Sequence, residues 1–417
     1  MSKTDSDSGE QSAITQGDGW RGLRSNGRAL FRGLLLVVFT LPLLYVALSL
    51  GWRPLSAWQS TLVEQSSDPD NIVRGARAVA SSANVYATVD PPLRYVPLAV
   101  LFVIFDPGTF AAQALTQTYT TVLNFVVLPL TLAALLWRVA DWESAFLTLL
   151  GFMVWQWLGI TENAYYDGFW HYVFVFPLVF LTLLLLHDCL QEEDTIHRRL
   201  RATGVGLLVG AIGLNQYVYG ALTALVIFVA FVFHRRWVDL GLSGSIGALC
   251  GVALLLSPGR TKSFVAQSAI GRLGIEQWSL AVLASGVVDV LTTPSYLLFL
   301  LIGLGGGALF IVSERRVSDT GVIEASLLVY GSVGIVATLL VHPRWFAQLS
   351  IYVFQYLILG TVVTLALSTL RDLQPPGWSY VERCLSSPLQ LPWAAVWAVT
   401  WVIAAAASVL LIPIQAP

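Results

Sequence analysis

Long, continuous apolar blocks are the feature that most limits what this chain can fold into. Several blocks approach the roughly 20 residues that an α-helix needs to cross ~30 Å of hydrocarbon. Because no water is present at that depth, a crossing segment must satisfy its own backbone hydrogen bonds, and a helix does so within one segment. The sequence therefore predicts an all-α, polytopic integral membrane protein with about 10–11 membrane helices.

The composition is not that of a soluble globular domain. Of the 417 residues, 56% are hydrophobic and only 12% are charged, whereas a soluble domain has about 25% charged residues. The mean hydropathy of +0.71 points the same way. No basic cluster exceeds a few arginines, so we expect no nucleic-acid partner.

The N-terminal region predicts how the chain enters the membrane. Residues 1–27 are polar and are expected to form a disordered cytoplasmic tail, and residues 28–417 a single transmembrane domain. The first span, Gly33–Leu50, is interpreted as uncleaved. Four arginines stand before it: Arg21, Arg24, Arg28 and Arg32. Because arginines gather on the cytoplasmic side, we expect a multi-pass protein of the cell membrane with a cytoplasmic N-terminus.

The remaining apolar blocks differ in length. Further spans are predicted at residues 119–137, 145–160, 169–187, 240–256, 294–312, 321–341, 346–367 and 392–412. The block at residues 95–105 is too short to cross and is expected to be interfacial or re-entrant. Polar residues interrupt the block at residues 204–233, which predicts two short helices that meet at the break.

Arginine positions predict which loops share a side of the membrane. If residues 204–233 form a hairpin, one group of arginine-bearing loops faces the cytoplasm: Arg138, Arg198, Arg199, Arg201, Arg235, Arg236, Arg315, Arg316 and Arg371. Three basic residues fall on the other side: Arg260, Lys262 and Arg272. The outer face then receives the loop at residues 52–94, the break near Asn215 and the segment His342–Arg344.

The outer loop at residues 52–94 carries the most informative polar residues. If residues 71–80 are helical, Asp70, Arg74 and Arg77 share one face, because their spacings are four and three residues. Asp68 or Asp70 would cap the start of that helix. On residue types alone, the simplest interpretation is a capped helix with solvated arginines.

The order of motifs in this loop resembles the GT-C class of polytopic glycosyltransferases, and is most similar to its mannosyltransferase-like branch. An acidic residue is followed by Ala76-Arg77-Ala78, then Asn84-Val85-Tyr86, and a P-P-x-x-Y-x-P-L run starts at Pro91. A later G-x-x-x-G run at Gly206, followed by an Arg-Arg-Trp triplet, is also similar to that branch. The resemblance extends over about residues 30–240. Asn215 or Gln216 stands where the branch commonly has a lysine, and its nearby proline is missing.

The resemblance implies a polyprenyl-phosphate sugar as donor, mannose-like, with a glycan, lipid or protein as acceptor on the outer face. Asp70, or next Asp68, would be the general base that accepts the proton of the acceptor hydroxyl. The donor phosphate would be steadied by an arginine, whose planar fork suits phosphate. Candidate residues for donor phosphate or substrate binding are Arg74, Arg94, Arg344, His342, Asn215, Gln216 and Tyr219. No cofactor or metal ligand is assigned, and the need for a divalent metal is left open.

Plainer explanations exist for several of these residues. His342 and Arg344 fit a helix stop with snorkelling ends as well as a lipid-phosphate contact. Asn215, Gln216 and Tyr219 fit helix–helix hydrogen bonding as well as a cavity lining.

Two other classes of function compete with an enzyme. A transporter or lipid flippase is expected to carry charged residues within several spans, or paired broken helices in two halves. One clear break and few mid-span charges are present, and the polar groups gather in outer loops, which favours an enzyme. A membrane-embedded assembly protein without catalysis is the third class.

Overall fold

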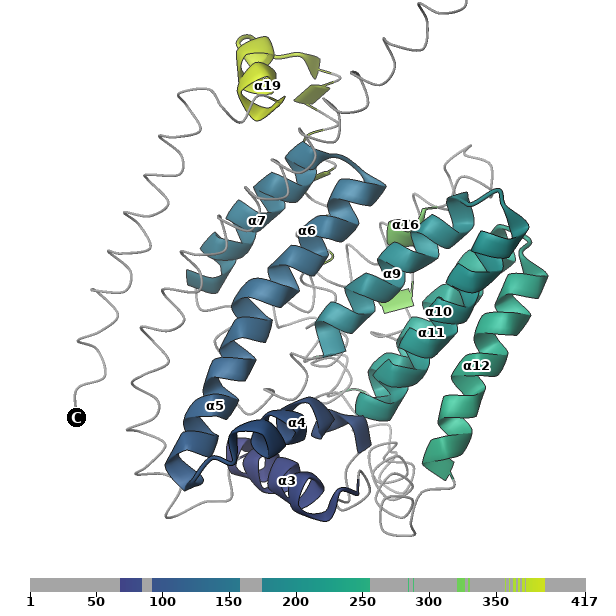
Figure 1. Cartoon of the computed structure of the whole chain (residues 1–417). Coiled ribbons are helices and arrows are strands. Elements are labelled where there is room, and N and C mark those ends of the chain that lie inside the picture. Colours follow the sequence, from purple (N-terminus) through teal and green to yellow (C-terminus); the bar gives the residue numbers. More distant parts are fainter. Residues whose placement is uncertain are drawn as a thin grey trace, which may run out of the picture.

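The computed structural model describes the following parts of the chain: residues 68–84, 92–157, 175–255, 321–326, 329–330 and 373–386, with single positions between 284 and 371. In these parts every regular element is a helix, and no strand occurs, which confirms the all-α prediction (Figure 1). None of the described helices combines the length and apolarity of a membrane-crossing helix. The predicted spans at 33–50, 294–312, 346–367 and 392–412 lie wholly or almost wholly outside the described residues.

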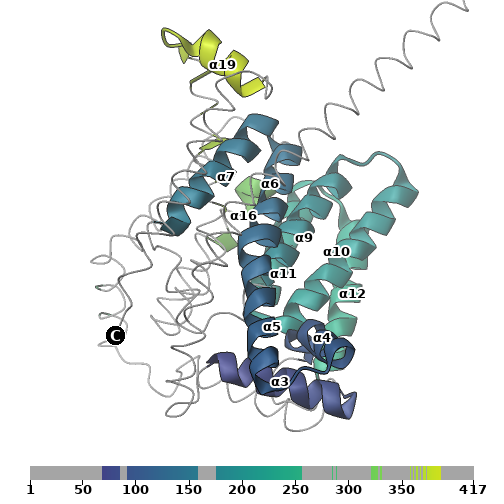
Figure 2. The same ribbon diagram turned by 60° about the vertical axis from the view of Figure 1, so that its left-hand side comes forward.

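Two short helices lie across one end of the helical bundle (Figures 1 and 2). Helix α3 spans Asp68–Ser82, which confirms the helix expected at residues 71–80. After the 3-10 turn η1, Pro92–Arg94, the short apolar piece at residues 95–105 forms helix α4, Val96–Phe105. Pro97 suits the first turn of α4 because its missing N–H would have no partner there.

A long helical rod follows, and it begins ten residues before the predicted span at 119–137. Helix α5, Thr109–Val122, continues through the π-helical turn η2, Leu123–Val127, into α6, Leu128–Val139. In an α-helix the ring of Pro129 would clash with the carbonyl four residues earlier. The wider π turn just before it accommodates that ring. Helix α7 then spans Trp142–Trp157, close to the predicted 145–160.

Four more helices complete the main bundle: α9 Val175–Gln191, α10 Thr195–Asn215, α11 Tyr217–Phe233 and α12 Trp237–Leu255. Gln216 alone is extended between α10 and α11, so the predicted pair of helices meeting at a polar break is confirmed. The two helices form a tight hairpin, because a Cβ on Gly220 would lie 2.5 Å from the Cα of Gly213. Two shorter helices are α16, Val322–Ser326, and α19, Trp378–Ser386.

Several arginines that were predicted to lie in loops are helical, including Arg138 and Arg371. Arg198, Arg199 and Arg201 do not lie in a loop, because α10 begins nine residues before the predicted start at 204. The side chain of Asp194 caps the helix by accepting from the backbone N–H of Ile196 at 2.7 Å. This cap starts the helix early, and the arginines therefore occupy its first two turns.

The described arginines of the predicted cytoplasmic group lie at one end of the bundle, opposite α3 and α4 (Figure 1). Ion pairs link neighbouring helices at this arginine end. The shortest N···O distances are Arg138–Asp188 2.7 Å, Arg198–Asp239 2.9 Å, Arg201–Glu192 2.8 Å and Arg371–Asp141 2.6 Å. Arg315 and Arg316 lie outside the described residues.

Asp141 makes stability at the arginine end dependent on pH. Its carboxylate accepts from the backbone N–H of Ser144 at 2.7 Å and from Arg371 at 2.6 Å. Burial on its own would raise the pKa of Asp141, but the hydrogen bonds from Arg371 and Ser144 and the charge of Arg371 hold that pKa below its ordinary value. Asp141 therefore stabilises the fold above its unfolded-state pKa of about 3.9, and this contribution is lost as pH falls further.

We expect acidification from pH 6 to about pH 3 to lower the unfolding temperature of the wild type more than that of Asp141→Asn. The variant starts from a lower unfolding temperature, because the neutral amide loses the attraction of Arg371. Thermal unfolding of both proteins across this pH range checks the prediction. Parallel pH curves for the two proteins would contradict it.

Candidate functional site

The described candidate residues lie at or toward the end of the bundle that carries α3 and α4 (Figure 1). Asp68 and Asp70 occupy the first turn of α3, and their side chains lie outside what the structure describes. Arg74 follows one turn later and is exposed. His342 and Arg344 lie outside the described residues.

Helix α3 is held against α4 by an aromatic ring placed on a glycine. Tyr95 is 2% exposed and covers Gly75 so closely that a Cβ at that position would lie 2.6 Å from Cε1 of the ring. Arg77 donates to the carbonyl oxygen of Pro107 at 3.4 Å, which ties α3 to the connection between α4 and α5. The Ala76-Arg77-Ala78 motif and the P-P-x-x-Y-x-P-L run therefore form one packed unit, and it holds the backbone that carries Asp68 and Asp70.

Gly75→Ala is expected to destabilise the protein by about 1–3 kcal/mol, because the added methyl group overlaps the ring of Tyr95. At a helix position without such an overlap, replacing glycine by alanine stabilises the protein. A loss of stability in Gly75→Ala therefore reports the overlap with Tyr95. Gly241→Ala is the matched control, because a Cβ on this helical glycine meets no atom within 4 Å. Thermal unfolding should show a loss for the first variant and no loss for the second; equal behaviour would contradict the packing.

The turn between α10 and α11 buries two amide side chains. Asn215 and Gln216 are each only 1% exposed. Within the described part of the chain, both polar atoms of the Asn215 amide and Oε1 of Gln216 have no hydrogen-bond partner. A buried polar group in this state costs about 1–3 kcal/mol. Buried polar groups without a hydrogen-bond partner are rare in folded proteins, and a functional role is one explanation for them.

Arg94, in the P-P-x-x-Y-x-P-L run, lies near the same end of the bundle as Asn215 and Gln216. It ends η1, which packs against α10 near the end of the bundle where that helix stops (Figure 1). Its side chain is half-buried, and its Nε is shielded from solvent. Amides both donate and accept, and guanidinium only donates. Groups of these two kinds are the ones that bind hydroxyls and phosphates in proteins.

Tyr219 lies in the helix core. It is fully buried, and its ring meets that of Phe176 edge to face, with centroids 5.5 Å apart. This places the ring of Tyr219 in the contact between α11 and α9.

A buried polar contact was not anticipated from the sequence. Thr223 on α11 and Tyr330 hydrogen-bond through their hydroxyl oxygens at 2.7 Å, and both side chains are fully buried. The two residues are 107 positions apart, and each stands in an apolar run, so no local pattern marks either one. The bond joins α11 to the segment that follows α16.

Among the residues that the structure describes, no three His, Cys, Asp or Glu side chains come together as a metal ion would require. No protein-family model, no curated protein and no solved structure matches this chain. Function is therefore inferred from the residues and their geometry alone.

Proposed function

We propose that this chain is a polytopic membrane glycosyltransferase that moves a mannose-like sugar from a polyprenyl-phosphate donor to an acceptor at the outer face of the membrane. The arginine end lies at the cytoplasmic side, and the end with α3 and α4 is the outer, catalytic end. The acceptor is a glycan, a lipid or a protein.

One observation carries the proposal: the outer-loop motifs and the polar break lie at the same end of the bundle. The helix that begins with Asp68 and Asp70 packs on the segment that carries Arg94. That segment packs on α10, which ends at the buried amides of Asn215 and Gln216. A carboxylate, a guanidinium and hydrogen-bonding amides are the groups that this transfer uses.

The reaction follows from these groups. Asp70, or alternatively Asp68, accepts the proton of the acceptor hydroxyl while the hydroxyl oxygen forms a bond to the anomeric carbon of the sugar. The bond from that carbon to the phosphate oxygen breaks, and the lipid phosphate leaves with the electron pair. Arg94, with Arg74 or Arg344, stabilises the negative charge on the leaving phosphate. Asn215 and Gln216 orient the sugar or the phosphate.

A transfer assay tests the proposal. Purified full-length protein in lipid is given radiolabelled polyprenyl-phosphate mannose, or the glucose equivalent, together with a membrane lipid extract. We expect label to move from one donor to an acceptor. If folded protein transfers nothing from either donor, the proposal is wrong, and a transporter or a non-catalytic assembly protein becomes the better assignment.

A further inference from the structure

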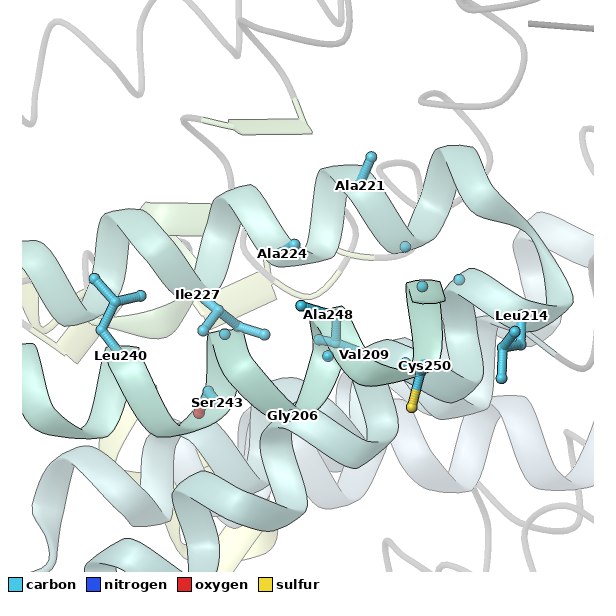
Figure 3. Close-up of a pocket in the computed structure, with 16 residues that line it drawn as sticks. Gly206, Val209, Leu214, Ala221, Ala224, Ile227, Leu240, Ser243, Ala248 and Cys250 are labelled. Atoms are coloured by element: carbon cyan, nitrogen blue, oxygen red, sulfur yellow. The ribbon is translucent and has the colours of Figure 1, made fainter. Parts of the chain in front are cut away.

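A groove of about 330 Å³ lies between α11 and α12, with α10 as its floor (Figure 3). Small residues dominate its lining, most of them glycines such as Gly206 and Gly244. Four larger apolar side chains complete the walls: Val209, Leu214, Ile227 and Leu240. The lining is therefore almost entirely apolar, which suits a hydrocarbon chain.

The floor of the groove is closed by tight helix packing. A Cβ on Gly206 would lie 2.5 Å from the backbone oxygen of Ser243, so α10 and α12 approach at backbone distance. The hydroxyl group of Ser243 is already engaged, because it donates to the carbonyl oxygen of Ala202 at 2.6 Å. The remaining side chains of the lining are apolar apart from the thiol of Cys250.

Two arginines stand at one end of this groove. Leu240 lines the groove, and its backbone N–H donates to the carbonyl of Arg236, one helical turn earlier. Arg235 is exposed, Arg236 is half-buried, and the adjacent Trp237 is 61% exposed. No carboxylate in the described ranges pairs with either arginine, whereas four other arginines at this end are paired.

The backbone at Arg235 is left-handed, with φ 55°. The backbone N–H of Arg236 donates to the carbonyl of Phe231 at 2.9 Å, which is the helix-ending arrangement that usually has glycine at the left-handed position. Arginine therefore stands where glycine would be more stable. A variant with glycine here removes the charge without straining the turn.

We propose that this groove and its two arginines bind one anionic phospholipid, with the headgroup phosphate on Arg235 and Arg236 and one acyl chain between α11 and α12. Arginine pairs well with phosphate, and an exposed Trp beside it is typical of the membrane interface. The site rests on the membrane location in the proposed function. The groove runs from Leu240 to Leu214, beside the break between α10 and α11. Arg235 and Arg236 lie at the opposite end of the bundle from α3, so the phosphate bound there is that of a bulk membrane lipid and not that of the sugar donor.

Lipid binding to full-length protein tests the site without any sugar transfer. Detergent-purified protein is titrated with phosphatidylglycerol or phosphatidylcholine, and bound lipid is counted by native mass spectrometry while unfolding temperature is followed. We expect phosphatidylglycerol to bind and stabilise more strongly. Its affinity should fall about fivefold for each of Arg235→Gly and Arg236→Gln, equal to about 1 kcal/mol per arginine. Without lipid, Arg235→Gly should unfold no earlier than the wild type.

A matched pair of glycine variants tests the acyl-chain groove. Gly244 lines the groove and Gly241 does not, yet a Cβ at either position meets no atom within 4 Å. Gly244→Leu should fill the groove and lose the phosphatidylglycerol effect, while Gly241→Leu should keep it. Equal effects of both lipids on the wild type, unchanged binding by Arg235→Gly, or preferential binding of polyprenyl phosphate would overturn the site.

Failure of this site and failure of the proposed function are distinguishable. Absent sugar transfer with intact phosphatidylglycerol binding rejects the enzyme and keeps the lipid site. Intact transfer without lipid preference rejects the lipid site alone. If the expressed chain does not sediment with membranes, both the membrane location and the lipid site are wrong.

Discussion

Asp70→Asn is expected to reduce sugar transfer by about 10²–10⁴-fold, the usual contribution of a positioned general base. The asparagine side chain has nearly the same shape, and it is tolerated in the first turn of a helix, where α3 places this residue. It cannot accept the proton of the acceptor hydroxyl at neutral pH. Radiolabel transfer from polyprenyl-phosphate mannose measures the effect, and donor binding should be retained.

Asp68→Asn is the comparison variant, because both residues belong to the same turn of α3. If only Asp68→Asn stops transfer, the base is Asp68. Wild-type transfer by both variants would remove the general-base assignment from this helix. Unfolding temperatures close to that of the wild type are required in both, so that a loss of activity reports chemistry and not folding.

Arg198→Ala is expected to destabilise the protein by about 3–5 kcal/mol, because it leaves a buried carboxylate without its partner. Asp239 is 2% exposed and Arg198 is 17% exposed, and Nε lies 2.9 Å from Oδ2. The other carboxylate oxygen, Oδ1, already has no hydrogen-bond partner within the described part of the chain. Because the Arg198–Asp239 pair joins α10 to α12, the packing of these two helices beneath the groove should loosen. Thermal or chemical unfolding measures the loss.

Two controls separate burial from charge. Arg138→Ala removes an arginine from a pair whose members are 60% and 27% exposed, and it should cost only about 0–1 kcal/mol. The double variant Arg198→Met with Asp239→Leu removes both charges, and it should recover most of the lost stability. Equal losses for Arg198→Ala and Arg138→Ala would show that burial of Asp239 does not govern stability here.

Much of the local structure could be predicted from the sequence. Uninterrupted apolar blocks predicted α7 and α12 to within a few residues. The polar residues at 215–216 predicted the break between α10 and α11, since two consecutive amides interrupt an otherwise apolar run there. The starts of α5 and α10 were placed too late, because polar residues extend these helices beyond their apolar parts.

The sequence by itself determined the helices and the break between α10 and α11, because hydropathy, caps and charge act within a few residues along the chain. Only the tertiary structure decided which groups meet. Asp141 pairs with Arg371, 230 positions away, and Tyr95 lies on Gly75 through the packing of two helices. The groove beside Arg235 exists because three helices come together. Such contacts depend on how helices dock, and no local pattern of residues specifies that.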